Sequence, residues 1–454
     1  MRSRQIKSEY NYFTPVSNAL HPDRFSFLHI DLNSFFASVE QQLHPEYRGR
    51  PLAVVPTMAD TTCCIAASYE AKTLGIKTGT QVGKAKEICP DIILVAGDHA
   101  EYAKYSHRIA EAVELACPVS HTPSIDEMVC QLMGREQEPP RARKIALEIK
   151  QSIYKNVGVA LRCSIGMAPN RYLAKIASDM QKPDGLIGLL PSQLPRAIAH
   201  LDLRDLPGVG ARTEVRLNAK GITTMEQLLA LDREGMHKLM NSVWGDRMYH
   251  WLRGAATGDD GAPVPEDVQK SLGHSHVLAP EHRSPEGSWA VAHKLLHKAA
   301  MRLRMEHFYT GSLAVTIRYQ LTREQADRMK SKKHYSGIKH SSWGMEARFR
   351  DCQDTLTLLE ILRSLWAQRP QGAEFQKPFF VGITLRTLIP ESEYQAELFA
   401  DPNNRAGLSA TMDKLNLKYG HTTLHFAGML LARESAPTRI AFTQIPVQYG
   451  VDYM

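Results

Sequence analysis

Residues 25–40, FSFLHIDLNSFFASVE, carry the pattern that decides the fold. The run from Phe25 to Ile30 is rich in apolar and aromatic residues and predicts a buried strand. The polar residues in Asp31-Leu-Asn-Ser34 end this run and are typical of the start of a helix. Asp31 therefore stands at a strand end, where an aspartate is most often a helix cap and is otherwise a functional carboxylate.

The sequence that follows, to about residue 187, alternates strand-like runs with helical patterns. Strands are predicted at 50–55, 61–67, 92–95, 124–132 and 160–165, and helices at 68–74, about 100–117 and about 141–156. This mixture predicts an α+β domain with antiparallel strand pairing.

From about Leu206 the pattern changes to short helical pieces interrupted by glycine-containing turns, which predicts a small helical domain. Residues 254–270, GAATGDDGAPVPEDVQK, are rich in Gly, Pro and Asp and predict a linker between domains. The length of 454 residues favours roughly three or more domains.

Beyond the linker, apolar residues recur on one face of a predicted helix at 288–305. Residues 313–319 then alternate apolar and polar side chains, and a second helix (355–367) and strand (379–386) repeat the arrangement. This pattern predicts a two-layer α/β module. One face of its sheet would offer Arg318 and Arg386 to a partner on the solvent side.

The bulk composition gives weaker signals. A formal net charge of +7 favours an anionic partner only mildly at this length. The seven cysteines show no metal-ligand spacing and suit a reducing compartment. No apolar stretch approaches the ~18 residues that span a bilayer, and the N-terminus lacks a signal-peptide core. We therefore expect a cytoplasmic protein with no membrane partner.

Two adjacent acids, Asp126 and Glu127, lie in the strand-like run at 124–129, flanked by apolar residues. Such a pair is usually a solvated turn. In a strand, neighbours face opposite ways, so both acids could reach one site only at a strand end or with metals between them. Together with Asp31 they would offer the oxygen ligands that Mg²⁺ prefers. Two such ions about 3.5–4 Å apart neutralise the charge that develops during nucleotide transfer.

Five segments, taken together, resemble the Y-family DNA polymerases, and most closely their bacterial polymerase IV branch. They are Asp31-Leu-Asn-Ser-Phe-Phe-Ala-Ser-Val-Glu40, Ser68-Tyr-Glu-Ala-Lys72, Ser124-Ile-Asp-Glu127, Leu173-Ala-Lys-Ile-Ala-Ser178 with Lys182-Pro-Asp-Gly185, and Leu206-Pro-Gly-Val-Gly210. They occur in the order and with the spacing of that family, over about residues 25–390.

The resemblance implies a right-hand polymerase fold of the α+β multidomain class, whose palm has a ferredoxin-like antiparallel sheet. Its parts would be a flexible tail (1–24), the palm (25–48 and 100–187), small fingers (49–99), a helical thumb with a helix-hairpin-helix (188–253), the linker (254–270), an α/β little finger (271–398) and a C-terminal extension (399–454). The implied activity is error-prone translesion synthesis, the addition of deoxynucleotides to a primer on damaged template DNA.

The resemblance also assigns residues. Asp31, Asp126 and Glu127, with the carbonyl of Leu32, would hold two Mg²⁺ ions. Phe36 matches the steric gate that excludes a 2′-hydroxyl, and its neighbour Phe35 adjoins the nucleotide site but is better explained as core. Triphosphate binding is implied for Tyr69, Lys72 and Lys175, and the roof over the base pair for Cys63, Ile65 and Gly79.

Two residues depart from the family pattern. Asn33 stands where many relatives have a second acid, and we expect a modest effect because that acid is not usually a direct ligand. Lys72 replaces the usual arginine, which keeps the charge but loses a bidentate fork for phosphate.

DNA contacts are implied at Gly208 and Gly210 of the hairpin, where backbone N–H groups could meet a phosphate. Arg318 and Arg386 would face the DNA backbone. Lys332 and Lys333, in a basic loop, could add phosphate contacts, although a solvated loop explains them too.

The segment beyond 399 is similar to the C-terminal region of the polymerase V catalytic subunit. Gln444, Val447 and Tyr449 have the spacing of a sliding-clamp peptide, a short motif with many chance matches. Two other functions stay open. A non-catalytic relative that binds DNA typically lacks the metal carboxylates, and a nucleotide cyclase would leave the hairpin and the C-terminal module without a purpose.

Overall fold

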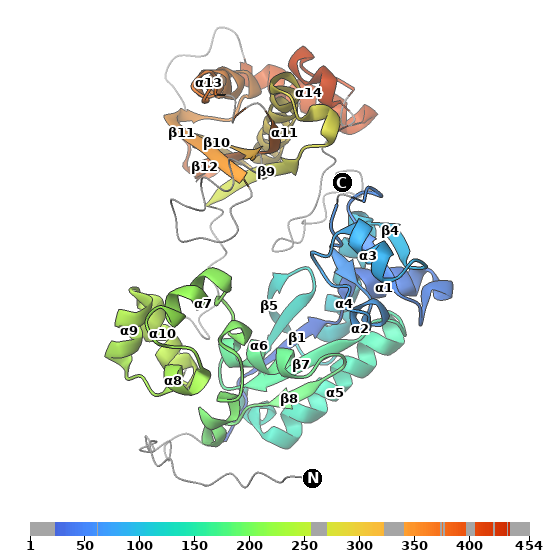
Figure 1. The fold of residues 1–454 in the computed structure, drawn as a ribbon, viewed down its shortest axis with the longest axis vertical. Coiled ribbons are helices and arrows are strands. Elements are labelled where there is room, and N and C mark those ends of the chain that lie inside the picture. The colour runs from blue at the N-terminus through green and yellow to red at the C-terminus, as the bar shows by residue number, and fades with distance from the viewer. Residues whose placement is uncertain are drawn as a thin grey trace. The chain divides into compact units, whose positions relative to one another are not determined.

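The computed structural model describes residues 23–60, 62–255, 270–321, 340–372, 375, 377–395, 405–420, 423–433 and 435. They form two compact units, divided between residues 265 and 266, which lies inside the predicted linker. Figure 1 shows the first unit in blue to green and the second in yellow to red. Residues 1–22 of the predicted tail and residues 256–269 of the predicted linker lie outside the described residues.

The first unit is built on a five-stranded sheet with the order β5-β6-β1-β7-β8. Its strands are β1 (Phe27–Leu32), β5 (Val119–Ser124), β6 (Glu127–Gln131), β7 (Cys163–Ala168) and β8 (Leu186–Gly188). The first four pair antiparallel, as predicted, but β8 runs parallel to β7. The antiparallel prediction therefore holds for the centre of the sheet and not for this edge.

The two faces of β1 serve different purposes because side chains alternate along a strand. Leu28, Ile30 and Leu32 point into a core shared with α4 (His99–Glu114) and α5 (Pro139–Asn156). On the opposite face Phe27 packs in a second core with α6 (Arg171–Met180) and the helical part of the unit. Asp31 lies four residues after Phe27 on the same strand and therefore points to the same face of the sheet, which α6 covers.

Three strand predictions were wrong in extent. Residues 124–132 are not one strand, because Ile125 and Asp126 form a turn between β5 and β6. Of the predicted strand at 61–67, the described part contains only β3 (Ala66–Ala67). The strand predicted at 160–165 begins later and is β7.

A small subdomain follows β1 and α1 (Phe35–Leu43) in the chain. Its sheet has the order β3-β2-β4, with β2 (Leu52–Val55) antiparallel to β3 and parallel to β4 (Ile93–Ala96). Helices α2 (Tyr69–Thr73) and α3 (Val82–Ile88) complete it around its own apolar core. This subdomain lies within residues 49–99, the range predicted as the fingers, and is called by that name below.

The helical part consists of α7 (Ala211–Asn218), α8 (Met225–Leu229), α9 (Arg233–Met240) and α10 (Val243–Trp251). It packs on α6 through a shared apolar cluster and is tied to it by Asn170, which donates to the carbonyl of Trp251 at 3.0 Å. The small helical domain expected from the sequence is thereby confirmed.

The second unit contains a four-stranded antiparallel sheet with the order β11-β10-β12-β9. The strands are β9 (Ser271–Val277), β10 (Phe308–Gln320), β11 (His340–Cys352) and β12 (Pro378–Pro390), and the sheet packs on α11 (Pro285–Met305) and α13 (Thr355–Ala367). The predicted two-layer module is confirmed, including the exposure of Arg318 and Arg386 opposite the buried face. The sequence analysis missed β9 and β11.

Part of the predicted C-terminal extension folds onto this unit. Helix α14 (Arg405–Tyr419) is held by a buried pair in which Arg304 donates to both oxygens of Asp413, at 2.6 and 2.9 Å. The 3-10 helix η9 (Ala427–Ala432) buries Ala432 in the same core, and Lys294 donates to the carbonyl of Arg433 at 2.6 Å. The described part of the extension therefore belongs to the module that precedes it.

Candidate active site

Asp31 and Glu127 lie directly opposite each other on the neighbouring strands β1 and β6. The ammonium group of Lys175, from α6, lies between them at 2.5 Å from Asp31 Oδ2 and 2.6 Å from Glu127 Oε1. Two predicted metal ligands and one predicted phosphate ligand thus meet at one point. Strand pairing supplies the acids, and the helix that covers this face supplies the lysine.

Asp126 reaches the same end of the sheet because it occupies the turn before β6. Its carbonyl accepts a hydrogen bond from the Leu32 amide at 2.9 Å, which fixes the turn against the end of β1. Ser124 donates from its hydroxyl to Asp126 at 2.6 Å and to Glu127 at 3.1 Å. The turn therefore removes the difficulty that adjacent strand residues point to opposite faces.

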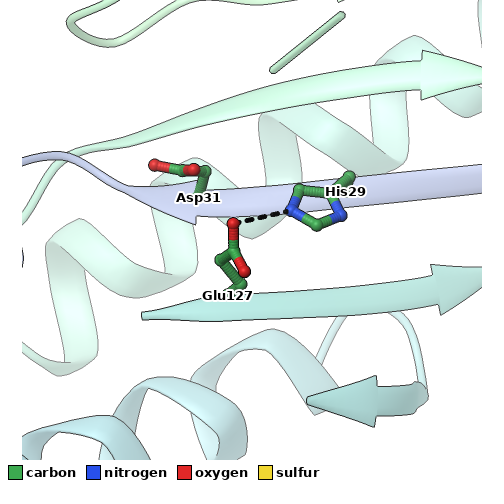
Figure 2. Close-up of side chains that lie close together, drawn as sticks. All are labelled: His29, Asp31 and Glu127. Atoms are coloured by element: carbon green, nitrogen blue, oxygen red, sulfur yellow. Dashed lines mark ion pairs between the residues drawn. The ribbon is translucent and has the colours of Figure 1, made fainter. Parts of the chain in front are cut away.

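His29 is a part of this cluster that the sequence analysis missed. Figure 2 shows it beside Glu127 and on the same strand as Asp31, and its Nε2 lies 3.6 Å from Glu127 Oε1. Atoms of His29, Asp31 and Glu127 that could bind a metal all lie within 4.8 Å of one another. The two-residue step from His29 to Asp31 along a strand puts both on one face, a signal that the sequence did contain.

The electrostatics of the three acids differ. Burial raises the pKa of Asp126 above its ordinary value, and the nearby acids add to this. Burial acts in the same direction on Glu127, but His29 and Lys175 outweigh it and hold the pKa of Glu127 well below its usual range. Glu127 is therefore a permanent carboxylate. Hard anionic oxygens of this kind fit a divalent cation such as Mg²⁺.

A second lysine contacts Asp31. The ammonium group of Lys182 lies 2.6 Å from Asp31 Oδ1 and 2.8 Å from Asp179, while Lys175 holds the other oxygen of Asp31. Burial lowers the pKa of both lysines, but the surrounding acids outweigh it and keep their pKa above the usual value. Both ammonium groups are therefore permanently charged.

Two of the predicted triphosphate residues come from the fingers and meet at the start of α1. Lys72 donates to the hydroxyl of Ser34 at 2.6 Å and lies 4.4 Å from the centre of the Tyr69 ring. Ser34 has a left-handed backbone with φ of 50°, which a non-glycine residue rarely adopts. This strained residue joins α1 to α2 and was not predicted.

Phe36, the predicted steric gate, lies in the first turn of α1 and stacks on Tyr102 with ring centres 4.3 Å apart. It is 5% exposed, and Phe35 beside it is 3% exposed. Tyr102 donates in turn to the buried carboxylate of Glu40 at 2.6 Å. Stacking on Tyr102 and burial thus fix the position of the Phe36 ring.

The predicted roof residues lie on one loop structure in the fingers. Cys63 is exposed and pairs through an isolated bridge with Gln81, and the Gly79 amide donates to the Cys64 carbonyl at 2.8 Å. The resemblance places Gly79 where the roof over the base pair stays small. The structure gives another reason for glycine at this position, a φ of +88°, whereas a Cβ there would meet no atom within 4 Å.

The predicted hairpin precedes α7. Gly208 has a φ of +86°, which favours glycine, whereas Gly210 has an ordinary backbone and caps α7 with no atom near its missing Cβ. A shallow, open depression of about 410 Å³ is lined by residues 204–210 together with Lys175 and Asp179. The hairpin thus opens toward the lysine of the carboxylate cluster.

The remaining predicted contacts are only partly described. Arg318 lies 4.4 Å from the Phe380 ring, and Arg386 pairs with Glu346 at 2.8 Å on the exposed face of the sheet. Lys332 and Lys333 lie outside the described residues, as do Gln444, Val447 and Tyr449. None of the described helices combines the length and apolar character needed to cross a membrane.

The first unit has a palm-like sheet with carboxylates at one strand end, a small subdomain that carries a lysine, and a helical region with a hairpin. This combination places the protein in the class of the polymerases. Residues 30–179 match the model of the impB/mucB/samB family, and residues 269–398 match the C-terminal domain of that family. The chain belongs to this family, the Y-family DNA polymerases.

The relatives are similar over almost their whole length. DNA polymerase IV of Moorella thermoacetica is 31% identical over 88% of this chain and 95% of its own. DNA polymerase IV 1 of Bacillus subtilis is 30% identical over 90% of this chain and 94% of its own. Among solved structures, a Y-family chimera of Dbh and Dpo4 shares the fold, with a TM-score of 0.65, 22% identity and coverage of 80% of this chain and 99% of its own.

Proposed function

We propose that this chain is an error-prone translesion DNA polymerase, which adds deoxynucleotides to a primer on a damaged template. The observation that carries the proposal is the meeting of Asp31, Glu127 and Lys175 from three separate elements. The match to the Y family supports the proposal, as do the curated relatives, which are named DNA polymerase IV.

The carboxylates of Asp31, Asp126 and Glu127, with the carbonyl of Leu32, are the groups that would hold two Mg²⁺ ions. When bound, these ions supply charge neutralisation at the attacking and leaving oxygens. His29 is buried, and its Nε2 lies 3.6 Å from Glu127 Oε1. The acids thus converge on one end of the sheet, and the ammonium groups of Lys175 and Lys182 would have to turn away from Asp31 when a metal ion binds.

The lysines and the tyrosine are suited to the triphosphate. Lys175, Lys72 and Tyr69 present ammonium and hydroxyl donors toward the same region from α6 and α2. Charge-assisted hydrogen bonds to phosphate are among the stronger polar contacts in proteins. Lys72 offers a point charge where an arginine would offer a fork, so its contact orients the phosphate less strictly.

Several parts of the proposal rest on the family likeness. Gly208, Gly210, Arg318 and Arg386, with Lys332 and Lys333, would contact the DNA backbone. Residues 444–449 would bind a sliding clamp, and the protein would act in the cytoplasm. The seven domain boundaries predicted from the sequence also belong to the proposal. A non-catalytic DNA-binding role is not favoured, because all three carboxylates are present.

Primer extension tests the proposed function directly. The full chain should extend a primer on both an intact and a damaged template with deoxynucleotides and Mg²⁺, and EDTA should abolish the extension. The length of the labelled primer is the measurement. A chain that binds primer-template but adds no nucleotide at any Mg²⁺ concentration would contradict the proposal and favour the non-catalytic alternative.

A further inference from the structure

We infer that Tyr172 is a positioning residue for the hairpin at residues 206–210, whose hydroxyl group fixes one peptide so that the Gly208 amide stays free to meet a DNA phosphate. The inference rests on the proposed function, in which the backbone amides of Gly208 and Gly210 contact the DNA backbone. Tyr172 lies on α6, three residues before Lys175, and the sequence analysis gave it no role.

The hairpin contains a tight turn at residues 206–209. The Val209 amide donates to the Leu206 carbonyl at 3.0 Å, which closes the turn. Pro207 and Gly208 are its two central residues, and the φ of +86° at Gly208 is typical of the second central position of a type II turn. Proline at the first central position and glycine at the second are favoured in this type of turn, so the local sequence agrees with the conformation.

Tyr172 holds the central peptide of this turn. Its hydroxyl group donates to the Pro207 carbonyl at 3.0 Å, and burial raises the pKa of Tyr172, so the hydroxyl keeps its proton. The ring stacks on Trp251 of α10 with ring centres 5.0 Å apart. Asn170, fully buried at the start of α6, donates to the carbonyls of Trp251 and Ala255 at 3.0 and 3.1 Å. The start of α6 therefore fixes both the hairpin and the end of α10.

The hydrogen bond to Pro207 decides where the Gly208 amide points. The Pro207–Gly208 peptide is trans, so its carbonyl oxygen and its N–H group point in opposite directions. Because the carbonyl is turned toward Tyr172, the Gly208 N–H group points away from the Tyr172 hydroxyl. Within the part of the chain that the structure describes, neither this amide nor that of Gly210 donates a hydrogen bond. Both amides are therefore available to an anionic oxygen.

Without the hydroxyl group, the same turn has a second accessible conformation. Turns of types I and II differ mainly by a rotation of the central peptide by roughly 180°, which exchanges the directions of its carbonyl and N–H groups. Glycine permits both, since it adopts positive and negative φ about equally readily. A rotated peptide would direct the Pro207 carbonyl toward the DNA, where its partial negative charge would repel a phosphate. The Tyr172 hydroxyl stabilises the conformation that binds.

The test measures the Kd of the full chain for primer-template DNA at several NaCl concentrations, by fluorescence anisotropy. The slope of log Kd against log NaCl concentration reports the number of phosphate contacts, at about 0.9 per contact on duplex DNA. The variants are Tyr172→Phe, which removes only the hydroxyl group, and Gly208→Ala, which is strained by the φ of +86° and by a Cβ 3.0 Å from Trp244. Ser152→Ala is the matched control, because the Ser152 hydroxyl donates to the Ala112 carbonyl at 2.6 Å between α5 and α4.

Tyr172→Phe should raise the Kd by about 3- to 10-fold and lower the slope by about 0.9, since one hydrogen bond to a phosphate is lost. Gly208→Ala should lower the slope by at least as much. In the double variant Tyr172→Phe should lower it no further, because both changes act on one amide. Ser152→Ala should change neither quantity. Binding is measured well below the melting temperature of each variant, so a loss of stability alone leaves the slope unchanged.

An unchanged slope in Tyr172→Phe, together with a lower slope in Gly208→Ala, would overturn the inference and leave the hairpin contact standing. Unchanged slopes in both variants would overturn the inference and the hairpin contact together. An equal fall in Ser152→Ala would also overturn it, since the effect would not be specific to the hairpin. Failure of the unaltered chain to bind primer-template at any salt concentration would instead contradict the proposed function itself, so the failures are distinguishable.

Discussion

Replacing Asp31 by asparagine should lower the rate of nucleotide addition by at least about a thousandfold, the loss expected when a central charge-stabilising group is removed. The change keeps the shape of the side chain and removes only its charge. The fold should survive, because Lys175 keeps its contact with Glu127 and Lys182 keeps its contact with Asp179. The measurement is the single-turnover rate of adding one deoxynucleotide at saturating Mg²⁺.

The matched control for this change is Asp60→Asn, which neutralises an exposed acid in the fingers that pairs with Lys86. Its rate should equal that of the unaltered chain. An Asp31→Asn variant that retains more than about a tenth of the rate would contradict the role of Asp31, because a tenfold change corresponds to only about 1.4 kcal/mol of activation free energy.

Replacing Phe36 by valine should admit ribonucleotides, with discrimination against the 2′-hydroxyl falling by about 10- to 100-fold. That range corresponds to a steric conflict of about 1–3 kcal/mol. The physical reason is the rigidity of the ring, which stacks on Tyr102 and cannot move aside for a larger sugar. The measurement compares kcat/KM for a ribonucleotide and the matching deoxynucleotide.

Phe35→Val is the control for the gate. Phe35 is as buried as Phe36 and belongs to the same core, so both variants should lose similar stability. Phe35→Val should leave sugar selection unchanged. Equal sugar selection in both variants would remove the gate role from Phe36, and relaxed selection in both would extend it to Phe35.

The fold was predictable where each segment contains its own periodic pattern. The alternation of apolar and polar residues at 313–319 predicted the buried and exposed faces of β10, because every second side chain must reach the core. Strand β9, with the sequence SLGHSHV, lies at a sheet edge and buries little, so its pattern is faint. The turn at Ile125 and Asp126 lacks glycine and asparagine, and the apolar residues on both sides favoured one continuous strand over the turn that an Asp-Glu pair usually forms.

The site was predictable in residue type but not in its connections. Asp31, Asp126 and Glu127 could be found because charged residues in apolar runs need an explanation. The contacts of Ser34, Asn33 and Lys182 join segments far apart in the chain, such as the 2.7 Å hydrogen bond from the Asp184 amide to Asn33. The spacing of residues along the sequence does not predict such contacts.

The most direct test of the carboxylate site is a crystal structure of the chain with primer-template, a non-hydrolysable deoxynucleotide and Mn²⁺, with anomalous difference density recorded for the metal. We expect two peaks that share Asp31 as a ligand, with Asp126 and Glu127 completing the set and Lys175 turned toward the phosphates. Peaks that contact none of these acids, or Lys175 still bound to Asp31 with the nucleotide in place, would contradict the proposed site.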